Sequence, residues 1–110
     1  MKIEKICNET LNETLYKHVH KSGLTIYALP KKSHTKSYAA FATKYGSLIT
    51  EFKTDSDSEV TKIPNGVAHF LEHKLFEQPD GTDAFLQYAK TGANANAYTG
   101  FNNTVYLYSC

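Results

Sequence analysis

The sequence lacks the long apolar run that a membrane-spanning helix requires. No stretch of the chain approaches the roughly 20 consecutive apolar residues that are needed to cross a bilayer. The N-terminal segment, MKIEKICNETLNETLYK, is too polar to contain the apolar core of a signal peptide. These two absences predict a cytoplasmic protein that does not associate with membranes.

An excess of charge of one sign is also missing. The chain has 12 Lys and Arg residues against 11 Asp and Glu residues, so its formal net charge is +1. A balance this even gives no positively charged surface of the kind that nucleic-acid-binding proteins present. We therefore expect no nucleic-acid partner.

Cysteine is scarce, and its placement argues against two kinds of stabilisation. The only cysteines, Cys7 and Cys110, stand near opposite ends of the sequence and form no C-x-x-C pair. A disulfide framework and a thiolate zinc site are therefore not expected. Cys7 is interpreted as a small core residue.

The rest of the composition is that of an ordinary globular protein, with 41% hydrophobic and 21% charged residues. A chain of 110 residues can form one small domain but not two. The apolar pattern predicts an amphipathic helix over residues 3–15, a strand hairpin over 15–32, a buried strand over 37–50 and a polar loop over 51–66.

Two helices and two strands are predicted after this loop. The first helix is expected to begin near Asn65 as its N-cap and to run to Glu77. Its expected buried stripe comprises Val67, Phe70, Leu71 and Leu75. The second helix covers residues 84–90, is capped by Thr82 or Asp83 and ends at Gly92. Strands over 93–99 and 103–109 follow.

This order of elements predicts an α+β fold in two layers, in which a mostly antiparallel sheet carries helices on one face. The final stretch, TVYLYSC, still alternates apolar and aromatic residues where the sequence stops. We therefore expect residues 1–110 to be the N-terminal part of a single domain that is incomplete at its C-terminus.

The stretch HFLEH, residues 69–73, contains the residue types of a hydrolytic metal site. Residues four apart lie on one face of a helix, so His69 and His73 could bind one zinc ion through neutral imidazoles. Glu72 reaches the same side, where a carboxylate can take a proton from a zinc-activated water and later protonate the leaving amine. Two histidines with this spacing also occur simply as the polar face of a helix, so the pattern alone leaves both interpretations open.

The region from Gly66 to Tyr108 resembles the zinc metallopeptidases of the pitrilysin family, the inverzincins, which include insulin-degrading enzyme and the mitochondrial processing peptidase. The resemblance rests on GVAHFLEHKLFE followed by GANANAYTGFNNTVYLY. In that family an inverted zinc helix precedes a strand of the form N-A-x-T and then a Thr-x-Tyr strand. The segment SGLTIYALPKK is similar to the family's first strand, and the likeness is greatest to bacterial, processing-peptidase-like members.

The resemblance implies a fold of the LuxS/MPP-like metallohydrolase type and a set of site residues. His69 and His73 would be zinc ligands, and Glu72 would activate water. Asn96 and Ala97 would lie on an edge strand that pairs with an extended peptide substrate. Phe76 would line an apolar side-chain pocket, although plain core packing is an equal alternative for it.

One part of the family's zinc site is missing from this sequence. The third ligand in the family is a glutamate several tens of residues after the second histidine, a position that falls beyond Cys110. Glu77 lies too close on the same helix to replace it. We therefore expect one zinc ion with an incomplete ligand set, and a second homologous half or subunit as a candidate partner. The alternative is a non-catalytic module, either truncated or shaping the chamber of such a peptidase.

Three further histidines are interpreted without a metal. His18 and His20 share a strand face and could chelate an ion in principle, but no third ligand stands nearby, which favours a solvated strand face. His34 lies in the polar segment KKSHTKS and is expected to be a loop residue.

Overall fold

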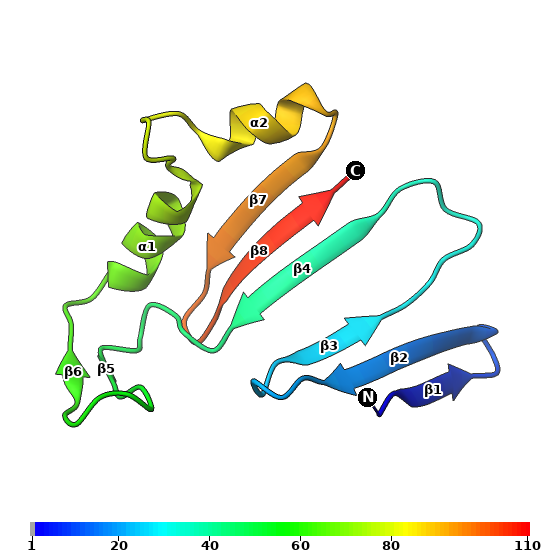
Figure 1. Ribbon diagram of the computed structural model, residues 1–110, viewed down its shortest axis with the longest axis horizontal. Coiled ribbons are helices and arrows are strands. Elements are labelled where there is room, and N and C mark those ends of the chain that lie inside the picture. The colour runs from blue at the N-terminus through cyan, green and yellow to red at the C-terminus, as the bar shows by residue number, and fades with distance from the viewer. Residues whose placement is uncertain (1) are drawn as a thin grey trace. The chain divides into compact units, whose positions relative to one another are not determined.

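A computed structural model describes residues 2–110 of the chain. Its elements are β1 (Glu4–Asn8), β2 (Glu13–Val19), β3 (Thr25–Ala28), β4 (Tyr38–Thr43), β5 (Glu51–Phe52), β6 (Thr61–Lys62), α1 (Val67–Phe76), α2 (Ala84–Lys90), β7 (Asn94–Thr99) and β8 (Thr104–Ser109) (Figure 1). Contacts divide the chain into two compact units, residues 2–35 and 36–110, which are described separately. Neither helix in the described part of the chain is long and apolar enough to cross a membrane.

The first unit is a three-stranded antiparallel sheet in the order β1-β2-β3. The expected hairpin over residues 15–32 is confirmed by β2 and β3, in which His18 pairs with Ile26. Gly23 has a φ of 86° in the connecting turn, a conformation that glycine adopts without steric cost. Its N–H donates to the carbonyl oxygen of His20 at 2.9 Å.

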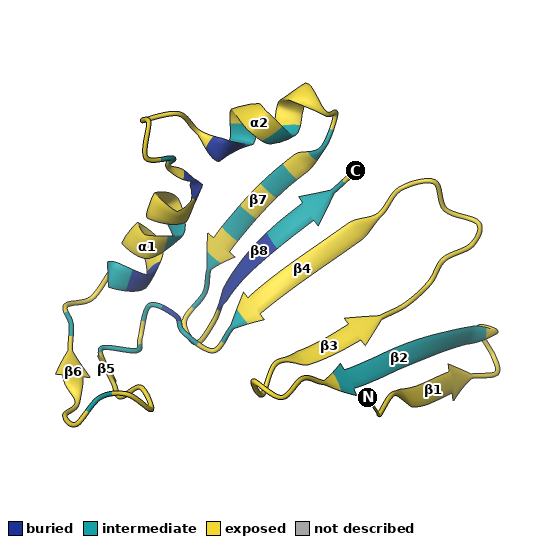
Figure 2. Cartoon of the chain, viewed as in Figure 1, coloured by how far each residue is buried: buried dark blue, intermediate teal, exposed yellow. Residues whose placement is uncertain are grey.

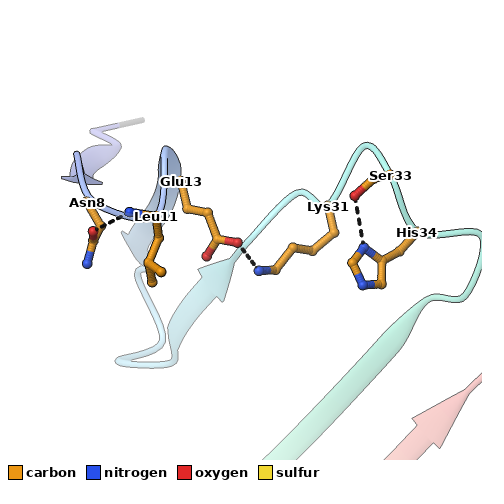
Figure 3. Close-up of polar contacts among 6 residues, drawn as sticks. All are labelled: Asn8, Leu11, Glu13, Lys31, Ser33 and His34. Carbon is orange, nitrogen blue, oxygen red and sulfur yellow. Dashed lines mark hydrogen bonds and ion pairs between the residues drawn. The ribbon is translucent and has the colours of Figure 1, made fainter.

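The prediction of an N-terminal helix over residues 3–15 is wrong, because residues 4–8 form β1 and pair with β2. The Asn8 side-chain oxygen accepts a hydrogen bond from the Leu11 N–H at 2.9 Å (Figure 3). Asn12 then adopts a φ of 50°. Asparagine favours both features, and together they reverse the chain where a helix would have continued.

Cys7 is exposed, so its interpretation as a core residue is wrong.

An ion pair joins Lys31 to Glu13 and thereby links the segment after β3 to the start of β2 (Figure 3). Because both partners are partly solvated, this pair contributes little to stability.

The second unit contains an antiparallel sheet in the order β4-β8-β7, with both helices packed against it. Ala97 pairs with Tyr106 and Ala95 with Tyr108, so these four side chains share the face that meets the helices. The core cluster comprises Phe76, Ala84 and Tyr106, and burial is greatest along β8 and at the helix ends that contact it (Figure 2). The predicted α+β class, with helices on one face of an antiparallel sheet, is confirmed.

The elements of this unit differ from the predictions mainly in extent. The strand expected over residues 37–50 is limited to β4, and the prediction that it is buried is wrong, because all of its residues except Thr43 are exposed. The loop over 51–66 contains the short hairpin of β5 and β6. Asp83 caps α2, because its carboxylate accepts a hydrogen bond from the Phe85 N–H at 2.8 Å. This resolves the choice between Thr82 and Asp83.

Helix α1 begins and faces the sheet differently from the prediction. Its N-cap is Gly66 rather than Asn65. The expected buried stripe is wrong, because Phe70 and Leu75 are 63% and 57% exposed. The residues that face the sheet are Ala68, which is 3% exposed, Phe76, which is 8% exposed, and the half-buried Glu72. Ala68, Glu72 and Phe76 are spaced four apart and therefore form one stripe on the helix.

The turn around Gly46 offers a test of the second unit's packing. A Cβ atom at Gly46 would lie 2.5 Å from the backbone N of Asn103 and 2.6 Å from the backbone of Phe101. Backbone cannot give way as a side chain can, so Gly46→Ala should lower the free energy of unfolding by about 1–3 kcal/mol. Urea denaturation measures this change.

Gly100→Ala is the matched control. A Cβ atom at Gly100 would meet the Asn103 side chain at 2.7 Å, and that side chain can rotate away. An equal loss of stability in the two variants would contradict the close backbone approach at Gly46.

Candidate active site

Helix α1 brings the two motif histidines together, and both side chains are exposed. The Nε2 atoms of His69 and His73 lie 3.0 Å apart, and their ring centroids are 4.8 Å apart. The local geometry of the helix is sufficient for this arrangement, because residues four apart stand one above the other. The pair therefore has the spacing that the sequence predicted.

The two imidazoles fit part of a zinc site. Zinc–nitrogen bonds of about 2.0–2.1 Å in tetrahedral geometry place two ligand nitrogens about 3.3 Å apart, close to the separation of the two Nε2 atoms. Within residues 2–110, however, no group of three or more His, Cys, Asp or Glu side chains could hold a metal ion. Glu77 forms an ion pair with Lys74 instead. The described residues thus place two imidazoles, and no third side chain of these types, within reach of one ion.

Glu72 lies on the sheet-facing side of α1, where its carboxylate meets the end of β7. The hydroxyl of Thr99 donates a hydrogen bond to Glu72 Oε2 at 2.5 Å, in a partly buried setting. Burial, and after it the negative charge of Glu72, raises the pKa of Tyr106 on β8. The carboxylate is therefore held against the sheet rather than extended into solvent.

A cleft of about 560 Å³ opens beside this carboxylate. Ten residues from α1, α2, the segment between them and β7 line it: Glu72, His73, Phe76, Glu77, Gly81, Thr82, Asp83, Phe85, Asn96 and Ala97. Five of the six site residues predicted from the sequence are among them. His69 is not, although it contacts His73. The structure thus gathers around one cleft residues that are up to 25 positions apart in the sequence, from Glu72 to Ala97.

Phe76 combines the two interpretations that the sequence left open. It is buried in the core cluster with Ala84 and Tyr106, and its ring also borders the cleft. It stacks on Phe85 with ring centroids 4.3 Å apart and an interplanar angle of 15°. The stacked pair makes one wall of the cleft aromatic.

Asn96 and Ala97 lie on β7, which is an edge strand of its sheet in the part of the chain that the structure describes. The Asn96 side-chain oxygen accepts a hydrogen bond from the Ala97 N–H at 2.9 Å. Asn94 stands at the start of the same strand and does not line the cleft. An edge strand beside a cleft can add an extended peptide by backbone hydrogen bonding.

Two residues that contact predicted site residues, Thr99 and Phe85, were not themselves predicted as site residues from the sequence. Thr99 is the last residue of the N-A-x-T segment, and its position in that motif is the signal that could have identified it. Phe85 follows the cap Asp83 at the start of α2, and no local pattern distinguishes it from an ordinary core aromatic. Thr99 joins the site by its hydrogen bond to Glu72, and Phe85 joins it by stacking on Phe76.

The three remaining histidines each have a local partner. His18 Nδ1 lies 2.9 Å from the Lys2 carbonyl oxygen, and His20 Nδ1 lies 2.8 Å from the Ser22 hydroxyl. His34 contacts the neighbouring Ser33 (Figure 3).

Comparison with known proteins points to one family. Residues 31–110 match the family described as insulinase, peptidase family M16. The chain is 50% identical over 107 residues to an uncharacterized zinc protease, YmfH, from Bacillus subtilis strain 168. It also superposes on the crystal structure of a protein described as an M16-like peptidase from Alicyclobacillus acidocaldarius, with a TM-score of 0.74 and 37% sequence identity.

The matched regions include nearly all of this chain but only a small part of each relative. They cover 97% and 99% of this chain but only 25% of the Bacillus protein and 23% of the Alicyclobacillus chain. The chain therefore spans about a quarter of the length of these relatives.

The histidine pair makes a direct prediction about zinc binding by this chain. Two imidazoles should bind zinc weakly, and His69→Ala or His73→Ala should each remove the measurable binding, because one imidazole remains. Isothermal titration with zinc measures this loss. His34→Ala is the control and should bind as the unaltered chain does. Zinc binding that survives both substitutions in α1 would contradict the site.

Proposed function

The chain belongs to the insulinase family, peptidase family M16, and on that basis we propose that it forms part of the catalytic centre of a zinc-dependent metallopeptidase that hydrolyses peptide bonds. The observation that carries this proposal is the cleft that Glu72 and His73 share with Asn96 and Ala97. Under this proposal, Glu72 is the general base, His73 is a zinc ligand and β7 is the edge strand that holds the peptide.

In this proposal His69 and His73 hold a zinc ion through their Nε2 atoms. The chemistry supplied by bound zinc is Lewis acidity, which makes water more acidic and polarises a peptide carbonyl. Glu72 accepts the proton of the attacking water at its carboxylate. As the oxygen of that water bonds to the carbonyl carbon and the C–N bond breaks, Glu72 returns the proton to the leaving amine nitrogen.

The substrate is proposed to be an extended peptide that pairs with β7. The backbone of Asn96 and Ala97 lies beside Glu72, so a strand added at this edge would pass along the cleft. Phe76 and Phe85 would contact an apolar side chain of that peptide. The third zinc ligand is proposed to come from polypeptide outside residues 1–110, in the same protein or in a homologous partner.

Replacement of Glu72 tests the proposed base. In the complete product of the reading frame that encodes this chain, Glu72→Gln should lower kcat for peptide hydrolysis by about 10²- to 10⁴-fold, because an amide cannot accept the proton. Zinc content, measured by atomic absorption, should stay unchanged. Glu59→Gln is the control: this glutamate is exposed and does not line the cleft, so the variant should keep zinc and most of the activity. Undiminished hydrolysis by Glu72→Gln would overturn the assignment.

A second candidate function is a non-catalytic module that shapes the chamber of such a peptidase. The observation that favours it is that residues 2–110 contain no group of three His, Cys, Asp or Glu side chains that could hold a metal ion. Retention of His69, Glu72 and His73 together favours the catalytic proposal, since a purely structural module has no use for them.

Zinc titration of the 110-residue chain separates these cases. Weak binding, combined with hydrolysis only by the complete gene product or after addition of a partner subunit, is the expected result for the catalytic proposal. Absence of zinc-dependent hydrolysis in every combination would support the non-catalytic module. Tight stoichiometric binding by the chain alone would show a third ligand among these residues and contradict the two-ligand geometry.

A further inference from the structure

The hydrogen bond between Thr99 and Glu72 joins two elements that are 27 residues apart in the sequence. The two oxygen atoms are 2.5 Å apart, within the range of hydrogen bonds donated by a hydroxyl. The bond therefore constrains where the Glu72 carboxylate lies.

Thr99 is the rigid partner in this contact. It ends β7 and pairs directly with Thr104 of β8. Thr104 is 2% exposed, and its own hydroxyl donates to the Tyr45 carbonyl oxygen at 2.8 Å. A β-branched side chain on a paired strand has few rotamers. The sheet thus fixes where the Thr99 hydroxyl points.

Glu72 is the flexible partner. Its side chain has three rotatable bonds, and among residues 2–110 it forms no ion pair and no other side-chain hydrogen bond. Without Thr99 the carboxylate could take several orientations beside the cleft. With Thr99, Oε2 is occupied and Oε1 is the oxygen left without a hydrogen bond within the described residues.

We propose that Thr99 is a positioning residue that holds Oε2 of Glu72, so that Oε1 is the atom that accepts the proton of the attacking water. This inference rests on the proposed function of Glu72 as the base. A base whose orientation is set before the substrate binds loses less entropy on reaching the transition state. The alternative is that Thr99 only joins α1 to the sheet.

The experiment compares Thr99→Val, which keeps the shape and removes the hydroxyl, with Thr99→Ser, which keeps the hydroxyl. In the complete gene product loaded with zinc, Thr99→Val should lower kcat at least about tenfold with little change in KM, because misorientation of a catalytic group affects the chemical step. Thr99→Ser should restore most of the lost rate. Zinc affinity, measured by isothermal titration, should be the same in all of these proteins.

Thr91→Val is the control at the end of α2. It removes a hydroxyl that donates to the Tyr88 carbonyl oxygen at 2.9 Å and does not touch Glu72 or Thr99, so it should leave kcat almost unchanged. If Thr99→Val and Thr91→Val lower kcat equally, or if Thr99→Ser is as slow as Thr99→Val, the positioning role is overturned.

A readout without zinc or substrate distinguishes failure of this inference from failure of the proposed function. Thr99→Val should lower the urea midpoint of the zinc-free protein when Glu72 is present, and should have little further effect in a Glu72→Ala background, because the partner is already gone. Additive shifts would show that the hydrogen bond is not formed and would overturn the inference. Coupled shifts in a gene product without zinc-dependent hydrolysis would instead overturn the proposed function, and the positioning role with it.

Discussion

The stripe of Ala68, Glu72 and Phe76 along α1 is the constraint on which the rest of the second unit depends. Ala68 is small, so the start of the helix can approach the sheet closely, and Phe76 fixes its end in the core cluster with Ala84 and Tyr106. This orientation turns Glu72 toward β7. His69 and His73 each follow a stripe residue by one position, so they lie together at the exposed border of the same helix face.

A glutamate on a sheet-facing stripe is costly unless its charge is hydrogen-bonded. Thr99 provides that bond, and it can do so only in the observed register of β7. Ala95, Ala97 and Thr99 share the face that meets the helices, while the side chains of Asn94, Asn96 and Tyr98 are exposed. A register shift of one residue would turn Thr99 away from α1. The pairing of β7 with β8 therefore determines whether the carboxylate has a partner.

The predictions from the sequence succeeded where local pattern decides the structure. The two helices, the hairpin over residues 15–32, the last two strands and the spacing of the histidine pair all follow from short-range periodicity. The prediction of an N-terminal helix was wrong because Asn8 and Asn12 form a turn, and the spacing of apolar residues carries no information about that turn. The predicted buried stripe on α1 was wrong because it was chosen for its apolar residues, Phe70 and Leu75. The helix instead packs against the sheet through the face that carries Glu72.

The candidate site divides in the same way between local and tertiary determinants. The separation of His69 and His73 needs only a helix, so the closeness of the two imidazoles could be predicted from five consecutive residues. The orientation of Glu72 needs β7 in register, and the aromatic wall needs α2 to bring Phe85 onto Phe76. Sequence proximity carries no information about either contact. A change that loosens β7 from β8 would therefore first disturb the contact between Thr99 and Glu72, whereas the hydrogen bond of the histidine pair joins two residues of α1 alone.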